Sequence, residues 1–158
     1  MSQDFFKSFV KENMGLIKSL CRAYAKDDED LKDLIQEVTL QLWRSHEKFE
    51  GRSQVSTWVY RVTLNVCLSQ ARKRKKDLPQ YSLDNFDTGE EIDTTEQEQI
   101  ALLYKAIRQL KEADRAIVLL YLEEKSYKEM AEILGMTVTN VGVKVNRLKN
   151  QLKKMING

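Results

Sequence analysis

Residues 126 to 137 read Ser-Tyr-Lys-Glu-Met-Ala-Glu-Ile-Leu-Gly-Met-Thr. Ser126 and Glu129 have the spacing of a capping box, in which each side chain can satisfy an unpaired amide at the start of a helix. Gly135 suits a left-handed C-cap, and Thr137 is a candidate N-cap for a further helix. A short helix, a tight turn containing glycine and a second helix together predict a helix-turn-helix.

The helix expected after Thr137 has two different faces. Its apolar residues recur at spacings of 3 and 4, which predicts a buried stripe of Val138, Val141, Val145, Leu148 and Leu152. The opposite face is polar and basic and carries Thr139, Asn140, Lys144 and Arg147, with Lys149, Lys153 and Lys154 further along. Such a face suits base edges in the major groove and the phosphates beside it. A plain helical hairpin with a solvated basic face is the alternative that the pattern leaves open.

Composition and charge extend this interpretation to the whole chain. Its 158 residues suffice for two small helical domains, and 32% charged residues with 6 Gly and 1 Pro favour an all-α protein. Residues 1–76 hold 15 Lys+Arg and 10 Asp+Glu, residues 77–98 hold 8 acids and no cation, and residues 99–158 hold 11 cations and 6 acids. We therefore expect two basic domains, 1–76 and 99–158, joined by a flexible acidic linker at 77–98.

Several classes of protein find little support in the sequence. No apolar run approaches the roughly 20 residues that span a bilayer, and no signal-peptide pattern opens the chain, so we expect a cytoplasmic protein. Cys21, Cys67 and His46 lack the spacing of a metal site, and both cysteines are interpreted as reduced packing residues. A catalytic set is also missing, so we expect no enzyme, no cofactor, no metal and no small-molecule ligand.

Helical periodicity predicts five further helices. The first covers about residues 4–25, the second runs from an N-cap at Asp27 or Asp28 to a turn at 48–51, and the third opens near 53–56 and ends in the tract 72–76. The residues that recur at helical spacing are Phe5, Phe6, Phe9, Val10, Leu16, Ile17, Leu20 and Tyr24 in the first helix, Leu31, Leu34, Ile35, Val38 and Leu42 as the core stripe of the second, and Val59, Val62, Val66 and Cys67 in the third. A fourth helix carries Ile100, Leu103, Ile107 and Leu110, and a fifth carries Ile117, Val118, Leu120, Tyr121 and Leu122.

The second helix has an apolar patch beside its core stripe. Leu40 and Trp43 share this face with three polar residues, Asp33, Gln36 and Glu37. An apolar patch rimmed by acids and amides is typical of a partner surface, such as one that receives a helix pair. The alternative, that Trp43 completes the domain's core, stays open.

The segment from Phe49 to Asn65 interleaves aromatic and basic residues. Phe49, Trp58 and Tyr60 accompany Arg52 and Arg61, a pattern that suits unpaired bases stacking on rings while cations hold the backbone. Core packing is the rival interpretation, especially for Trp58. The tract 72–76 holds five successive cations, which suit nucleic-acid phosphates, although a solvated helix end is the alternative.

Three ordered segments resemble the extracytoplasmic-function type of the bacterial sigma-70 family. Asp30-x-x-Asp33-Leu34-x-Gln36-Glu37-Val38-x-Leu40-x-x-Trp43 resembles its region 2.2, and Phe49-x-Gly51-x-Ser53-x-x-x-Thr57-Trp58-x-x-Arg61-Val62-x-x-Asn65 resembles the segment that recognises and melts the minus-ten element. Arg115-x-x-x-x-Leu120-x-x-x-Glu124-x-Ser126-Tyr127-x-Glu129-Met130-Ala131-x-Ile133-Leu134-Gly135 resembles region 4, which reads the minus-thirty-five element. The resemblance covers nearly the whole chain and leaves only the linker unmatched.

The resemblance implies a sigma factor, built from a region 2 helical bundle and a region 4 helix-turn-helix, that directs promoter-specific initiation and promoter opening. Its partners would be core RNA polymerase, through the largest subunit's clamp helices and the flap, promoter DNA as duplex and melted strand, and an anti-sigma factor. The polymerase-binding residues would be Asp33, Gln36, Glu37, Leu40 and Trp43, with a flap contact around Leu119 to Leu122. The minus-ten residues would be Phe49, Arg52, Ser53, Trp58, Arg61, Asn65, Arg72, Lys73 and Arg74. The minus-thirty-five residues would be Thr139, Asn140, Lys144 and Arg147.

The sequence departs from the family at the start of the recognition helix. Many relatives have Pro and Gly-Thr there, whereas this chain reads Met136-Thr-Val-Thr-Asn-Val-Gly142, so the resemblance does not give the promoter sequence. The acidic linker would thread the polymerase, mimicking nucleic acid or serving as a plain tether. A conventional repressor or activator, dimerised through its N-terminal domain, is the main rival, and it should bind operator DNA without polymerase.

Overall fold

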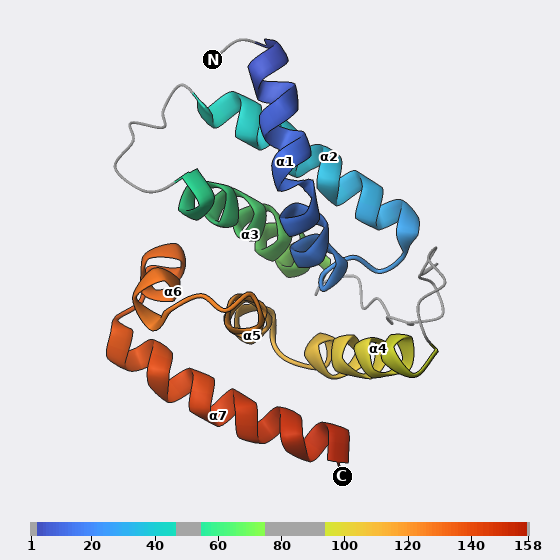
Figure 1. Cartoon of the computed structure of the whole chain (residues 1–158), viewed down its shortest axis with the longest axis vertical. Coiled ribbons are helices and arrows are strands. Elements are labelled where there is room, and N and C mark those ends of the chain that lie inside the picture. Colours follow the sequence, from blue (N-terminus) through green and yellow to red (C-terminus); the bar gives the residue numbers. More distant parts are fainter. Residues whose placement is uncertain (1–2, 47–54, 75–93, 158) are drawn as a thin grey trace. The chain divides into compact units, whose positions relative to one another are not determined.

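The protein folds entirely as helices in the part of the chain that its computed structural model describes, residues 3–46, 55–74 and 94–157 (Figure 1). These helices are α1 (Gln3–Arg22), α2 (Asp28–Ser45), α3 (Val55–Arg74), α4 (Thr94–Arg108), α5 (Glu112–Leu122), α6 (Tyr127–Leu134) and α7 (Val138–Asn157). None of these described helices is long and apolar enough to cross a membrane. The all-α prediction is therefore confirmed.

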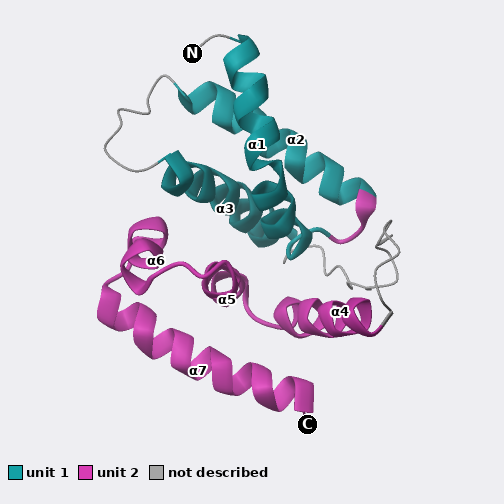
Figure 2. Ribbon diagram, viewed as in Figure 1, with its two compact units in different colours: residues 1–25, 29–79 teal, residues 26–28, 80–158 magenta. Residues whose placement is uncertain are grey.

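The chain divides into two compact units (Figure 2). Unit 1 comprises residues 1–25 and 29–79, and unit 2 comprises residues 26–28 and 80–158. The helix α4 begins at Thr94, so residues 94–98, which the sequence assigned to the linker, form its first turn. The acidic side chain of Glu96 lies in that turn, where it interacts favourably with the helix dipole. The rest of the expected linker lies outside the described residues.

Unit 1 is built around buried side chains from α1, α2 and α3. Ile17, Leu20, Val38, Leu42 and Val59 are fully buried. The buried face of α1 follows Phe6, Phe9 and Val10, whereas Phe5, which belongs to the same helical pattern, is 60% exposed just beyond the edge of that face. Four other residues of the helical patterns are only half-buried: Leu16, Leu31, Ile35 and Val62.

Cys21 and Cys67 contact each other inside unit 1. Both are free and fully buried, and the Cys67 thiol donates a hydrogen bond to the Cys21 sulfur over 3.8 Å. This hydrogen bond, together with burial, raises the pKa of the Cys67 thiol, so the thiol stays protonated and unreactive. The cysteines are packing residues that join α1 to α3, as the sequence predicted.

The helix-turn-helix of unit 2 forms through the predicted caps. Ser126 Oγ accepts the amide of Glu129 at 3.1 Å, and Glu129 Oε1 accepts the amide of Ser126 at 3.1 Å. Gly135 has φ +67°, the left-handed conformation that lets α6 end without steric strain. Thr137 Oγ1 then accepts the amide of Asn140 at 3.1 Å and caps α7. Each cap follows from local chemistry, which explains why the sequence alone predicted this motif.

The core of unit 2 is formed by the inward-facing sides of α4 to α7. Ile107, Leu120, Met130, Val141 and Leu148 are almost completely buried. Arg115 is also buried, and its guanidinium closes the α4–α5 connection by donating to the carbonyls of Leu110 at 3.0 Å and Arg108 at 2.7 Å.

The sequence overestimated this core at its ends. Val138, which was predicted to be buried, is 49% exposed, and Ile100 is 40% exposed. Val138 is the first residue of α7, and Ile100 lies in the second turn of α4. Leu152 and Leu103 are half-buried, and Tyr121 and Leu122 are exposed at the end of α5.

Substituting Ser126 by alanine should lower the free energy of unfolding of unit 2 by about 1 kcal/mol, the usual value of an N-cap. Hydrogen bonds from Ser126 lower the pKa of Glu129, so the carboxylate's contribution is complete above its ordinary pKa of about 4.3 and is lost as the pH falls through the lowered pKa. Urea denaturation of both proteins across pH should therefore show the difference shrinking in acid. An equal difference at neutral and acidic pH would mean that the Ser126 hydroxyl does not help to lower the pKa of Glu129, whose carboxylate keeps its hydrogen bond to the backbone amide of residue 126 in the variant.

Candidate nucleic-acid and partner interfaces

The residues expected to bind polymerase gather on one face of α2. Gln36, Leu40 and Trp43 follow at helical spacing and are exposed, Leu40 by 40% and Trp43 by 39%. Asp33 is exposed beside them, and Glu37 is half-buried. A large apolar pair that stays open to solvent, next to polar side chains, favours the partner-surface interpretation over the core.

Trp43 is exposed and yet fixed in orientation. Its ring lies edge-on to Phe6, with centroids 5.0 Å apart, and stacks on His46 at 4.6 Å. A ring held in this way loses little conformational freedom when a partner covers its open side, and such aromatic residues often dominate binding energy. We call the face of Asp33, Gln36, Glu37, Leu40 and Trp43 the α2 docking face.

The residues expected to bind the minus-ten element separate into exposed and buried groups. Arg61, Asn65, Arg72 and Lys73 are exposed along α3. Trp58 is only 9% exposed and its ring lies 5.7 Å from that of Phe9, which favours core packing for this residue. Tyr60 is buried as well. Phe49, Arg52 and Ser53 lie outside the described residues.

Arg74 differs from its neighbours in the basic tract. Its guanidinium forms an ion pair with the Asp30 carboxylate and donates to the Tyr24 carbonyl at 3.2 Å. The side chains of Arg74 and Asp30 are only 17% and 10% exposed. Arg74 thus joins the end of α3 to α2 and to the segment after α1, while Arg72 and Lys73 face solvent. From the sequence alone these cations are equivalent, because no local spacing pairs Arg74 with Asp30.

The recognition helix α7 presents its polar residues near its start. Thr139 and Asn140 are exposed, Lys144 is half-buried, and the Arg147 side chain is 59% exposed. Arg147 Nη2 lies 3.4 Å from the Asp114 carboxylate of α5. A surface ion pair of this kind contributes about 1 kcal/mol or less, so a phosphate can displace Asp114 at little cost.

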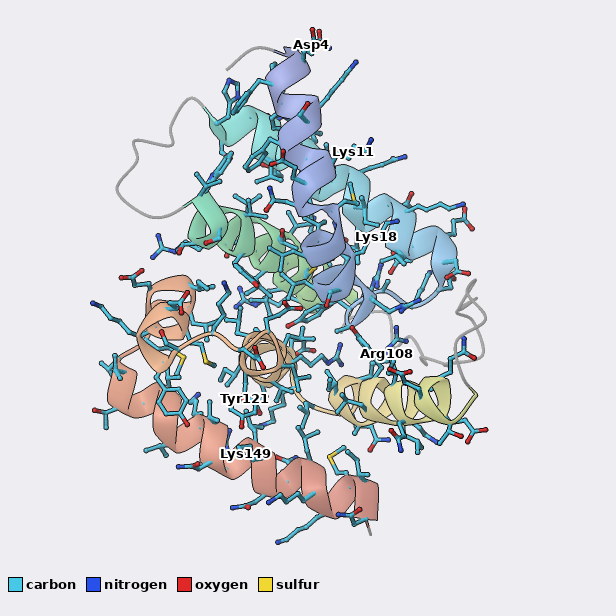
Figure 3. The ribbon with its side chains drawn as sticks, in the orientation of Figure 1. Asp4, Lys11, Lys18, Arg108, Tyr121 and Lys149 are labelled. Atoms are coloured by element: carbon cyan, nitrogen blue, oxygen red, sulfur yellow. The ribbon has the colours of Figure 1, made fainter. Side chains whose placement is uncertain are left out.

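An apolar groove of about 200 Å³ lies between α5 and α7. Its lining residues include Ile117, Tyr121, Leu122, Leu152 and Ile156. Lys149 stands at its edge with its ammonium 5.2 Å above the Tyr121 ring, and Figure 3 shows the two side chains between these helices. The hydrogen bond between them raises the pKa of Lys149, which keeps its charge.

The residues that can make the expected flap contact differ from those predicted from the sequence. Of residues 119–122, Leu119 and Leu120 are core residues that no partner can reach. Tyr121 and Leu122 remain exposed, and the α7 side of the groove was not anticipated from the sequence. Among the described residues, no cluster of His, Cys, Asp or Glu has the arrangement of a metal site.

The chain matches two families over most of its length. Residues 9–77 match the family described as Sigma-70 region 2, and residues 100–152 match Sigma-70, region 4. Residues 78–99 lie between the two matches. The two matched segments contain the α2 docking face, the exposed side of α3 and the helix-turn-helix, in the order that the sequence predicted.

Curated relatives are similar over nearly the whole chain. The ECF RNA polymerase sigma-E factor of Haemophilus influenzae is 28% identical over 165 residues, covering 96% of this chain and 87% of the relative. The ECF RNA polymerase sigma factor SigW of Bacillus subtilis is 29% identical over 171 residues, covering 98% and 90%. These relatives are initiation factors and not catalysts.

Two solved structures have the same fold. The sigma factor RpoE from Bartonella quintana, in complex with the anti-sigma factor NepR, has a TM-score of 0.79 at 20% identity and is matched over 99% of this chain and 98% of its own. CnrH, in complex with the cytosolic domain of CnrY, has a TM-score of 0.74 at 16% identity over 99% and 90%. At these identities the likeness shows the fold alone. The family matches and the curated relatives show that the chain belongs to the extracytoplasmic-function group of the sigma-70 family, whose members recognise promoters and direct transcription initiation with RNA polymerase.

Proposed function

We propose that unit 1 docks on the clamp helices of the polymerase's largest subunit through the α2 docking face. The observation that supports this most is the half-exposed ring of Trp43, held against Phe6 and His46 beside the exposed Gln36. A monomer that had no partner would gain by burying this ring and Leu40. Glu37 is half-buried at the border of the face, and its Oε1 accepts a 3.0 Å hydrogen bond from Gln41 Nε2.

The exposed side of α3 binds the separated strand of the minus-ten element. Arg61, Arg72 and Lys73 supply cations for phosphates, and Asn65 supplies an amide for a base or sugar. Arg74 acts through Asp30, which fixes the end of α3 and so the position of Arg72 and Lys73. Trp58 supports this surface from the core, where it packs on Phe9.

Unit 2 reads the minus-thirty-five element as duplex DNA. Thr139 and Asn140 lie in the first turn of α7, which is the part of a recognition helix that meets base edges in the major groove. Lys144 and Arg147 follow on the same helix and reach phosphates. The apolar groove between α5 and α7 receives an apolar segment of the polymerase flap.

Promoter opening follows from these contacts without a catalytic residue. Two DNA-binding units of modest affinity, held at a fixed separation, can gain about 10² to 10⁴ in avidity. Polymerase that holds both units therefore lets them bind both promoter elements at the same time. Side chains that bind unpaired bases and not the duplex shift the population toward the open promoter. Because this mechanism requires polymerase and promoter DNA, the protein acts in the cytoplasm, where both are found.

An anti-sigma protein regulates the chain by covering surfaces that polymerase needs. The solved structures with the same fold hold their sigma factors in complexes with anti-sigma factors. The α2 docking face and the α5–α7 groove are exposed apolar surfaces, among the residues that the structure describes, that such a partner would cover.

Asn140→Ala should relax base preference at one position of the minus-thirty-five element. An amide paired with a base edge contributes about 1–3 kcal/mol of discrimination, or about 5- to 150-fold. The measurement is sequencing of promoters retained by holoenzyme from a library randomised in that element. Asn150→Ala is the matched control, because Asn150 is also an exposed asparagine of α7 but lies nearly three turns further on. If the two variants retain the same promoters, Asn140 does not read a base.

A further inference from the structure

Val143 is, at 63%, the most exposed large apolar side chain in the part of the chain that the structure describes. It lies on α7, two residues after the fully buried Val141 and two before the buried Val145. Two residues correspond to about 200° around a helix, so Val143 points almost directly away from the core of unit 2. Packing within unit 2 therefore gives this side chain no role.

The neighbours of Val143 on the helix surface are polar. Thr139 precedes it by four residues and Arg147 follows it by four, so the three exposed side chains lie on one side of α7. Asn140, three residues before Val143, borders the same side. Scattered apolar residues are common on protein surfaces, but Val143 stands in the middle of a face whose other members carry groups for bases and phosphates.

Gly142 leaves the helix bare on one flank of Val143. Glycine weakens a helix interior relative to alanine, and the β-branched valine does so to a smaller extent, so this pair disfavours the helix to which it belongs. Packing does not require the glycine, because a Cβ there would meet the Tyr127 ring at 3.4 and 3.6 Å, which are ordinary contact distances. A glycine in this place instead lets the backbone of α7 come close to a surface that lies against Val143.

The major groove of DNA offers an apolar group that fits a valine. Thymine exposes its 5-methyl group there, whereas the other three bases present hydrogen-bonding groups. A cytosine that has been methylated at carbon 5 exposes the same methyl group at the same place. The valine side chain has no donor or acceptor, so its gain comes from removing such a methyl group, and its own, from water.

We propose that Val143 is a methyl-reading residue, which contacts the 5-methyl group of one pyrimidine in the minus-thirty-five duplex. Thymine is one source of this methyl group and 5-methylcytosine is the other, so the chain responds to cytosine methylation at that base pair. This inference rests on the proposed function, because α7 must lie in the major groove for Val143 to reach a base. It differs from the amide contact of Asn140 in the chemical group that is recognised.

The test uses holoenzyme assembled from core polymerase and the full chain, with a promoter selected from the library randomised in the minus-thirty-five element. Each thymine of that element, on either strand, is replaced in turn by uracil, which pairs identically and lacks only the methyl group. Wild-type holoenzyme should bind one uracil-substituted promoter about fourfold more weakly, the effect of one methyl group removed from water. Val143→Ala holoenzyme should bind the thymine and uracil promoters equally.

Val138→Ala is the matched control, because Val138 is also an exposed valine of α7 but belongs to the stripe on the core side of the helix. This variant should keep the difference between thymine and uracil. The same proteins are then compared on promoters with cytosine or 5-methylcytosine at the responsive position. A Val143-dependent response to thymine alone makes thymine the source of the methyl group, and a response to both bases adds methylated cytosine.

Equal binding of wild-type holoenzyme to every thymine and uracil promoter overturns the inference, as does a difference that persists in Val143→Ala. Scrambling the whole minus-thirty-five element separates these results from failure of the proposed function. If scrambling weakens wild-type binding, unit 2 reads the element and only the role of Val143 fails. If scrambling has no effect, the proposed function fails and the methyl contact with it.

Discussion

Trp43→Ala should weaken the affinity of the chain for core RNA polymerase by about 30- to 1,000-fold. Aromatic residues at the centre of an interface commonly contribute about 2–4 kcal/mol when truncated, and the Trp43 ring is both exposed and held by its neighbours. The affinity is measured by titrating fluorescently labelled chain with core polymerase and recording anisotropy. No other exposed side chain of the α2 docking face offers an apolar surface as large.

The control separates docking from folding. Trp43 contacts Phe6 and His46, so its removal also lowers the stability of unit 1, and thermal unfolding of the free variant must show that it is still folded at the assay temperature. Leu102→Ala truncates an apolar side chain on α4 that is 55% exposed and lies outside the docking face. Equal affinities of wild type, Trp43→Ala and Leu102→Ala would contradict the docking proposal.

Asp30→Ala should lower the free energy of unfolding of unit 1 by about 3 kcal/mol. It removes the Asp30 carboxylate from an ion pair with the guanidinium of Arg74, whose side chain is only 17% exposed, and breaking a buried ion pair on one side costs about 3–5 kcal/mol. The lower end applies because both side chains retain some contact with water. The quantity is obtained from urea denaturation followed by circular dichroism.

A second ion pair provides the comparison. Asp114→Ala removes the partner of Arg147, whose side chain is 59% exposed, so the loss should stay below about 1 kcal/mol. If Asp30→Ala and Asp114→Ala cost the same, Asp30 does not fix the end of α3. The Asp30→Ala variant should also bind the minus-ten strand more weakly, since Arg72 and Lys73 lose their fixed position.

The sequence predicted most of the fold because the signals are local. The capping box of Ser126 and Glu129, the left-handed Gly135 and the Thr137 cap each depend on residues within one turn, and all three form as expected. Helical periodicity located the buried faces but not their edges, so Val138 was wrongly assigned to the buried stripe of α7. A hydrophobic period gives the direction of a face, whereas its width depends on how far the neighbouring helix extends.

The site was predicted less completely because its details depend on contacts between distant residues. The pairing of Arg74 with Asp30 joins positions 44 residues apart, and no spacing rule reveals it. The role of Trp58 could not be assigned from the sequence. A tryptophan at this helical position can either pack in the core or stack on a base, and the spacing of residues is the same in both cases.

The most direct test is run-off transcription from a panel of the host's own promoters, with purified core polymerase in the presence and absence of this chain. We expect new initiation at specific promoters with the wild-type chain, and its loss when Gln36 and Trp43 are both replaced by alanine. The Leu102→Ala protein should behave as wild type. The account would be contradicted if core polymerase stayed inert with the wild-type chain while the chain alone bound a defined duplex as a dimer, as a conventional repressor does.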